Sequence, residues 1–273
     1  MSRSHQDPIA ANRRLWDART PVHLRSAYYD VEGFRSGRSS LHDLEVDEVG
    51  DVAGRTLLHL QCHFGLDTLS WARLGARVTG VDFSPVAVTE ARKLAAELGV
   101  EACFVESDIY ALPDILTGTF DVVFTSYGAL AWLPDITRWA QVACSFVRPG
   151  GLLYVAELHP AAMTLSDEPG VRQLRIGYPY WSAGEPLRFE EEGTYADYDA
   201  PLKLPEYVWN HGLGEIVSGI VEAGLVLEFL HEHDRTVYQQ LPFMQKGADG
   251  WWRLPPTMPA LPLLFSLRAR KVG

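Results

Sequence analysis

Residues 56–84, TLLHLQCHFGLDTLSWARLGARVTGVDFS, decide the fold of this chain. Short apolar runs alternate there with helical stretches, which predicts a strand at 56–60, a helix at 66–74, a strand at 77–81 and a helix at 84–98. Ser84 and Pro85 supply an N-cap and a first-turn proline for the second helix, and Gly99 ends it. Strands and helices in this order predict parallel βαβ units.

The same alternation continues toward the C-terminus. It predicts strands at 103–106, 120–125, 152–158, 225–230 and 261–269, with helices at 136–147 and 214–223. The expected fold is a Rossmann-like, doubly wound α/β sheet that is mostly parallel. Because no clear helix separates the last two strands, we expect an antiparallel pair, and hence an antiparallel edge strand, at one side of the sheet.

Composition narrows the class of protein. The chain has 273 residues, and its 24 basic and 35 acidic side chains give a formal net charge of −11. This balance excludes a general nucleic-acid-binding surface, which needs clustered positive charge. No apolar run is long enough for a membrane span or placed as a signal peptide, and the three cysteines show no disulfide or metal pattern. We expect a cytoplasmic protein, and the sequence indicates no oligomeric state.

Two segments depart from the alternation. Residues 1–50 are polar with scattered aromatics, and they predict an N-terminal arm or lid with a short helix over 12–18. The main domain is expected at 51–273. Within it, residues 160–210 hold eight of the 30 aromatic side chains and predict an inserted cap.

The arm and the cap differ in charge. Seven arginines and four acids give residues 1–41 a net charge of +3, whereas seven acids and two basic residues give residues 185–206 one of −5. Opposite charges attract, so we expect the arm to fold toward the cap over the binding site.

Ligands of open parallel sheets bind beyond the carboxyl ends of the strands. The residues that follow the first four predicted strands are Gln61, His63 and Gly65, then Asp82 and Phe83, then Asp108 and Ile109, and finally Ser126 and Tyr127. A carboxylate at Asp82 suits the hydroxyls of a ribose, and the helix N-terminus after 61–65 suits a charged tail. The pattern predicts a bound nucleoside whose base lies near Phe83, Asp108 and Ile109.

The succession LLHLQCHFG, VTGVDFS, VESDIYALP, FDVVFTSYG and VRPGGLLYVAE resembles the ordered motifs of the class I S-adenosylmethionine-dependent methyltransferases. The resemblance covers about residues 55–158, and the helix, strand, strand ending is similar to that family's tail. It implies S-adenosyl-L-methionine as cofactor, Asp82 as the ribose-binding acid and Asp108 as the partner of the adenine amino group. Phe83 and Ile109 would flank the adenine, and Tyr29 on the arm would close over the cofactor.

The first motif departs from the family pattern of one acid and three alternating glycines. Those places hold His59, Gln61, His63 and Gly65, so only the last glycine remains. We expect side chains to replace part of the backbone contact with the methionine tail. Asp67, in the first turn of the next helix, is a substitute for the missing acid.

Methyl transfer is an in-line displacement, so a base is needed only when the acceptor must lose a proton. His159, at the end of the fifth strand, is the predicted base, although His159-Pro160 also suits a simple turn. Tyr127 and Trp132 are expected to form an aromatic wall beside the methyl group, or to be ordinary core residues. Contacts with the substrate are expected at Trp132, Glu157, Tyr207 and His211.

The resemblance implies methyl transfer, and we expect a small-molecule acceptor because the acidic charge opposes nucleic acid and the cap suits a small ligand. N-, O- and C-methylation stay open. One alternative is a protein of this fold that binds the cofactor without methyl transfer. Another is a nicotinamide oxidoreductase, which is disfavoured because the segment QCHFG lacks the G-x-G-x-x-G motif of that class. No metal is predicted, since His231, Glu232 and His233 form no compact ligand motif.

Overall fold

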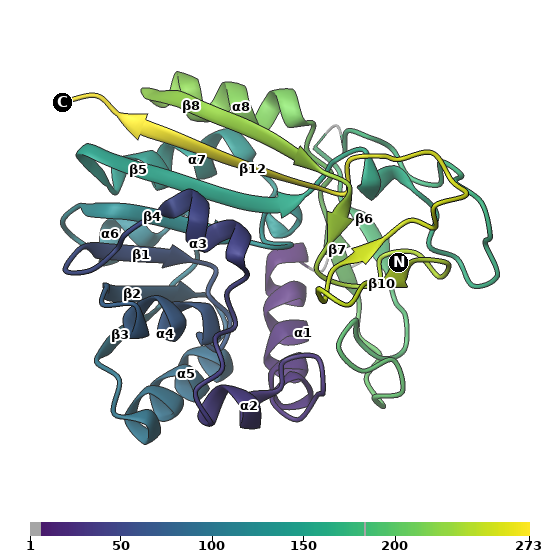
Figure 1. Ribbon diagram of the computed structural model, residues 1–273, viewed down its shortest axis with the longest axis horizontal. Coiled ribbons are helices and arrows are strands. Elements are labelled where there is room, and N and C mark those ends of the chain that lie inside the picture. Colours follow the sequence, from purple (N-terminus) through teal and green to yellow (C-terminus); the bar gives the residue numbers. More distant parts are fainter. Residues whose placement is uncertain (1–6, 183) are drawn as a thin grey trace, which may run out of the picture.

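The computed structural model describes residues 7–182 and 184–273, so residues 1–6 of the predicted arm and residue 183 of the predicted cap lie outside it. A seven-stranded sheet forms its centre (Figure 1). In order across the sheet, the strands are β3 (Ala102–Glu106), β2 (Arg77–Asp82), β1 (Thr56–Leu60), β4 (Phe120–Ser126), β5 (Val147–Leu158), β12 (Leu264–Lys271) and β8 (Leu225–His233).

The strands from β3 to β5 are parallel, and β12 runs antiparallel to both of its neighbours. The predicted mostly parallel α/β fold, with an antiparallel pair at one edge, is confirmed. Within that pair β8 is the outer strand and β12 lies one place inside it, because the last strand of the chain inserts between β5 and β8.

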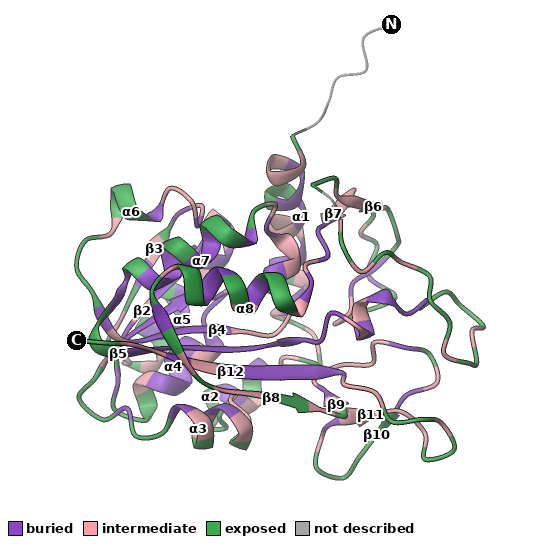
Figure 2. Cartoon of the chain, turned by 90° about the horizontal axis from the view of Figure 1, so that it is seen from above, coloured by how far each residue is buried: buried purple, intermediate pink, exposed green. Residues whose placement is uncertain are grey.

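Helices cover both faces of the sheet and keep its apolar strands from water (Figure 1). They are α1 (Pro8–His23), α2 (Val31–Arg35), α3 (Asp43–Val49), α4 (Leu66–Arg73), α5 (Pro85–Leu98), α6 (Leu112–Ile115), α7 (Ile136–Ser145) and α8 (Leu213–Glu222), with 3-10 turns η1 (Leu130–Trp132) and η2 (Ala162–Thr164). Helices α7 and α8 pack on one face, whereas α3, α4 and α5 pack on the other. Figure 2 shows the buried residues gathered in the strands and on the inner sides of the helices.

Local sequence explains where these helices begin and end. Ser84 Oγ accepts a hydrogen bond from Ala87 N at 3.0 Å, so α5 begins at Pro85 as predicted. The predicted helix over 12–18 is too short, because Asp7 caps the N-terminus of α1 and Pro8 occupies its first position. Helix α1 begins at Pro8, has 16 residues and reaches His23.

The cap region is mostly irregular chain with one hairpin, formed by β6 (Leu187–Phe189) and β7 (Glu206–Val208). The connection before β12 adds a second small sheet from β9 (Arg235–Thr236), β10 (Gln245–Lys246) and β11 (Trp252–Arg253). Apolar residues of this connection pack with Ala162 and Leu165, so both segments lie together beyond the carboxyl ends of the parallel strands (Figure 1).

The arm contacts the cap directly. The Asn12 side chain on α1 donates to Tyr207 O at 2.7 Å and accepts from Tyr207 N at 2.9 Å. Arg19 forms an ion pair with Glu206, and the Tyr29 and Tyr195 hydroxyls share a hydrogen bond. These contacts hold α1 beside β7. In the part of the chain that the structure describes, no helix combines the length and apolar character needed to cross a bilayer.

Candidate functional site

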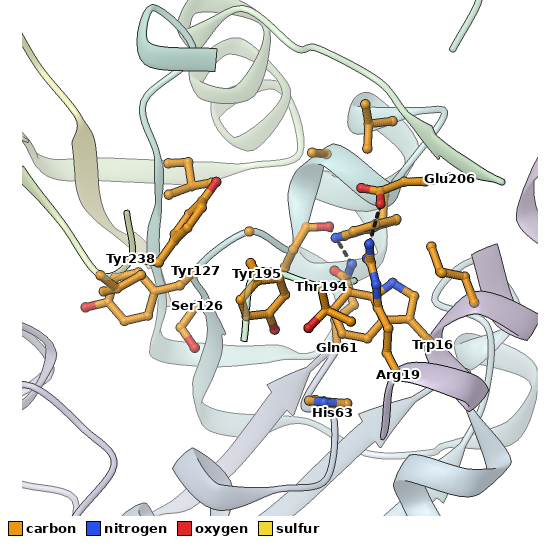
Figure 3. A pocket seen from close by; sticks show the side chains of 18 of the residues that line it. Trp16, Arg19, Gln61, His63, Ser126, Tyr127, Thr194, Tyr195, Glu206 and Tyr238 are labelled. Carbon is orange, nitrogen blue, oxygen red and sulfur yellow. Dashed lines mark hydrogen bonds and ion pairs between the residues drawn. The ribbon is translucent and has the colours of Figure 1, made fainter. Parts of the chain in front are cut away.

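A cavity of about 1200 Å³ lies at the carboxyl ends of β1, β2, β3 and β4 (Figure 3). The loops after these strands, the arm, the cap and the connection before β12 all contribute to its wall. Twelve residues singled out in the sequence line it: Tyr29, Gln61, His63, Gly65, Asp67, Asp82, Phe83, Asp108, Ile109, Ser126, Tyr127 and Trp132. The sheet brings them together because the carboxyl ends of its parallel strands share one edge.

Asp82 ends β2 and is buried at the cavity wall. Its Oδ2 accepts from His63 N at 2.8 Å, and its Oδ1 accepts from Ser84 N at 2.9 Å. Burial raises the pKa of this carboxyl to about 6, although the backbone hydrogen bonds oppose the shift. Each oxygen has a further lone pair, so Asp82 can accept two more hydrogen bonds from a ligand.

The loop after β1 retains a backbone shape that usually requires glycine. Gln61 has φ 58° and His63 has φ 51°, both in the left-handed region that side chains disfavour. Gly65 has φ 81°, and a Cβ there would lie 2.6 Å from the Phe104 ring. The glycine-rich conformation therefore survives although only one glycine remains. Strained residues of this kind often occur at binding sites.

Two buried polar atoms of this loop have no partner among the described residues. Gln61 Nε2 donates to Ala129 O at 2.7 Å, which leaves Gln61 Oε1 unpaired. His63 Nε2 lies 3.0 Å from His23 Nδ1, which leaves His63 Nδ1 unpaired. Burial lowers the pKa of both imidazoles, and the Arg19 charge lowers them further, so both rings are neutral at pH 7. Gln61 and His63 both line the cavity, so a ligand can pair with Gln61 Oε1 and His63 Nδ1.

Variants with glycine at residue 61 or 63 are expected to have a larger free energy of unfolding than variants with alanine there. Alanine has a Cβ that disfavours the left-handed conformation by about 1 kcal/mol, whereas glycine adopts this conformation without that cost. Denaturant unfolding of Gln61→Gly, Gln61→Ala, His63→Gly and His63→Ala measures the difference. Cys62, whose φ is not positive, is the matched control, and there alanine is expected to be more stable than glycine. Equal stability of the glycine and alanine variants at 61 and 63 would contradict the strain.

Two further carboxylates face the cavity. Asp67, in the first turn of α4, accepts from Ser40 Oγ at 2.6 Å and from Ser126 Oγ at 3.2 Å. Asp108 follows β3, and its Oδ1 accepts from Tyr110 N at 2.8 Å. One Asp108 oxygen is therefore held by the backbone, which fixes the direction of the other.

Aromatic side chains form the rest of the wall. Trp132 packs edge to face on Trp16 of α1, with ring centroids 5.1 Å apart. Tyr127 donates its hydroxyl hydrogen to Glu45 Oε2 at 2.6 Å and has φ 37°, so its ring direction is set by both its backbone and α3. Glu45 is fully buried, and burial raises its pKa to about 8.

The structure places His159, the predicted base, outside the cavity lining. Its Nδ1 accepts from Ala161 N at 3.1 Å, and its Nε2 lies 2.9 Å from the Glu232 carboxylate. Glu157 also lies outside the cavity wall. Its carboxylate accepts from four backbone N–H groups, those of Gly128, Ala129, Leu130 and Leu158. Glu157 thus holds the loop after β4 in place.

Two other predicted substrate contacts, Tyr207 and His211, also lie outside the cavity lining. Tyr207 does not line the cavity, whereas its neighbours Glu206 and Val208 do, because successive side chains of a strand point to opposite sides. His211 places Nε2 2.7 Å from Leu133 O and faces a separate, much smaller pocket. Both residues connect the cap to its surroundings.

Several cavity residues were not predicted from the sequence. Trp16 and Arg19 come from α1, Tyr195 from the cap and Tyr238 from the connection before β12 (Figure 3). Asn12, Trp16, Arg19 and His23 share one face of α1 at helical spacing, which is a signal the sequence contains. The predicted helix over 12–18 contains Asn12 and Trp16 but stops before Arg19 and His23.

Potential metal ligands do not gather in the described ranges, 7–182 and 184–273: no three His, Cys, Asp or Glu side chains there could hold an ion together. His231 Nδ1 instead lies 2.7 Å from Glu48 Oε1, and His233 Nε2 lies 3.0 Å from Ser266 Oγ.

Known proteins resemble this chain in sequence and in fold. Residues 57–151 match the family described as "Methyltransferase domain". The "Ubiquinone biosynthesis O-methyltransferase" of Xanthomonas euvesicatoria pv. vesicatoria (strain 85-10) is 31% identical over 206 residues, which cover 72% of this chain and 80% of the relative. An "S-adenosylmethionine dependent methyltransferase from Mesorhizobium loti" superposes with a TM-score of 0.56 at 21% identity and covers 87% of this chain and 100% of its own. The magnesium protoporphyrin IX methyltransferase from Synechocystis PCC 6803, solved with bound SAH, gives a TM-score of 0.55 at 14% identity and covers 97% and 100%.

Proposed function

Because the chain belongs to the class I S-adenosylmethionine-dependent methyltransferases, we propose that its cavity holds S-adenosylmethionine beside a small-molecule acceptor for methyl transfer. The protein is an enzyme of this class, and its cofactor is S-adenosylmethionine. The observation that carries the proposed site is the single cavity wall that Asp82, Asp108 and Asp67 share.

The nucleoside half of the cofactor fits the residues after β2 and β3. Asp82 has two free lone pairs in a buried wall, which suits the two hydroxyls of a ribose. Phe83 and Ile109 would lie against the adenine ring, and the free oxygen of Asp108 would accept from its amino group.

The methionine half fits the loop after β1. The unpaired Gln61 Oε1 and the carboxylate of Asp67 are acceptors that would hold an ammonium group. Ser126, which already donates to Asp67, would keep that carboxylate in position. Side chains would thus take over contacts that glycine backbone supplies in the usual first motif.

S-adenosylmethionine supplies an electrophilic methyl group on a positively charged sulfur when it is bound. Tyr127 and Trp132 present aromatic rings to the neighbouring space, where they would orient an acceptor and stabilise positive charge. The arm and the cap enclose this space, so they would act as a lid that excludes water. The O-methyltransferase relatives favour oxygen as the acceptor atom of this chain as well.

The test is incubation with methyl-labelled S-adenosylmethionine and a metabolite extract from the source cell, followed by mass spectrometry of labelled products. A labelled small molecule that forms with the wild type and not with Asp82→Ala is the expected result. Cofactor binding without any labelled product would instead favour a protein that binds without transfer.

The acceptor is a small molecule and not a nucleic acid, which the net charge of −11 supports. The cysteines Cys62, Cys103 and Cys144 are free, which supports the cytoplasm as the location.

A further inference from the structure

Arg19 is a buried cation in the wall of the cavity. Its side chain is 9% exposed, and its guanidinium carbon lies 5.5 Å from the Trp16 ring centroid and 5.7 Å from the Trp132 ring centroid. Its terminal nitrogen pairs with Glu206 on β7, as Figure 3 shows. The two indoles and Glu206 hold the planar guanidinium in a fixed direction.

One donor of this guanidinium is left over. Arg19 Nε is buried and has no hydrogen-bond partner among the described residues. A buried N–H group without a partner is costly, and the cost is larger for a charged group. Glu206 pairs with the terminal nitrogen and the Trp16 and Trp132 rings lie against the guanidinium, so an acceptor for Nε–H would have to come from a ligand.

The charge of Arg19 acts on His23 and on His63 in the cavity wall, whereas that of Glu206 acts on Tyr238. Burial lowers the pKa of His23 to about 3, and the Arg19 charge adds to that shift. The same charge contributes to the lowered pKa of His63, the residue that lines the cavity at the loop after β1. Glu206 is more exposed than Arg19, at 23% against 9%, so water screens its charge better.

We propose that Arg19 is the carboxylate-binding group of this cavity, which rests on the proposed function of the site. A guanidinium with a free Nε–H matches a carboxylate in charge and offers a donor to one of its oxygens. The carboxylate comes either from the methionine tail of the cofactor or from the acceptor. Because Arg19 belongs to α1, binding of that carboxylate also ties the arm to the ligand.

Binding calorimetry with two pairs of ligands separates the two sources. S-adenosylhomocysteine has the methionine carboxylate, and 5′-methylthioadenosine has the same nucleoside without it. Benzoate and benzyl alcohol, each offered with 5′-methylthioadenosine present, differ only in the acceptor carboxylate. Each ligand is titrated into the wild type, Arg19→Gln, Arg19→Lys and Arg35→Gln.

The carboxylate ligand that Arg19 binds is expected to lose about 10- to 100-fold in affinity in Arg19→Gln, while its neutral counterpart is unchanged. A loss confined to S-adenosylhomocysteine assigns the cofactor tail, and a loss confined to benzoate assigns the acceptor. Arg19→Lys keeps the positive charge but not the planar guanidinium donors, so a loss of affinity between those of the wild type and Arg19→Gln is expected. Arg35 is the matched control, because it lies on the exposed arm surface and pairs with Glu32 and Glu97.

Equal affinities of Arg19→Gln and wild type for both carboxylate ligands would overturn the proposal, as would an equal loss for each carboxylate ligand and its neutral partner. Failure of the proposed function gives a different result, since the wild type would then bind neither S-adenosylhomocysteine nor 5′-methylthioadenosine. Thermal melting verifies that Arg19→Gln folds. If Arg19→Gln does not fold, the affinities of Arg19→Lys are compared with those of the wild type instead.

Discussion

Asp82→Ala is expected to lower the affinity for S-adenosylhomocysteine by at least about 100-fold, because two hydrogen bonds from ribose hydroxyls to a buried carboxylate are lost. The substitution also leaves the N–H groups of His63 and Ser84 without their acceptor, which loosens the loop after β1. Isothermal titration calorimetry measures the affinity. Asp114→Asn, on the exposed surface of α6, is the matched control.

The same carboxyl predicts a pH dependence. The pKa of Asp82 is raised from 3.8 to about 6, so the ionised form that accepts both hydroxyls is lost as the pH falls through 6. Affinity is expected to fall below pH 6 in the wild type and to stay flat in Asp82→Asn. Folding responds in the opposite sense, because a raised carboxyl pKa contributes stability below 3.8 that is lost as the pH rises to 6. A wild-type affinity that is constant from pH 5 to 8 would contradict the ribose assignment.

Glu157→Ala is expected to lower the free energy of unfolding by about 4 kcal/mol or more, since buried backbone donors lose their acceptor. Three of these donors belong to residues 128–130, which connect Tyr127 to Trp132, so ligand affinity is expected to fall as well. Urea unfolding gives the first quantity, and calorimetry gives the second.

Glu157→Gln separates the acceptor role from packing. Glutamine keeps the size of the side chain and one carbonyl oxygen, but its amide group cannot accept from the remaining N–H groups. We therefore expect a stability between those of the wild type and Glu157→Ala. A direct substrate contact at Glu157 would instead reduce methyl transfer while stability stays unchanged.

Local patterns were sufficient for the central fold. The alternation from Thr56 to Leu158 identified β1 to β5 in order, and the caps at Ser84 and Gly99 set the bounds of α5. Because parallel strands end at one edge, the residues after each strand could be assigned to one site before any contact was known. The cavity lining at Gln61, Asp82 and Asp108 agrees with that reasoning.

The sequence by itself determined which side chains stand at the ends of the strands, since that depends on short-range periodicity. Only the tertiary structure decided that His159 faces Glu232, that Tyr207 points away from the cavity and that the Trp16 and Arg19 face of α1 closes it. The first and last of these depend on contacts between segments far apart in the chain: β5 with β8, and the arm with the cap. Their energies come from burial and hydrogen bonds between distant segments, which no local pattern encodes.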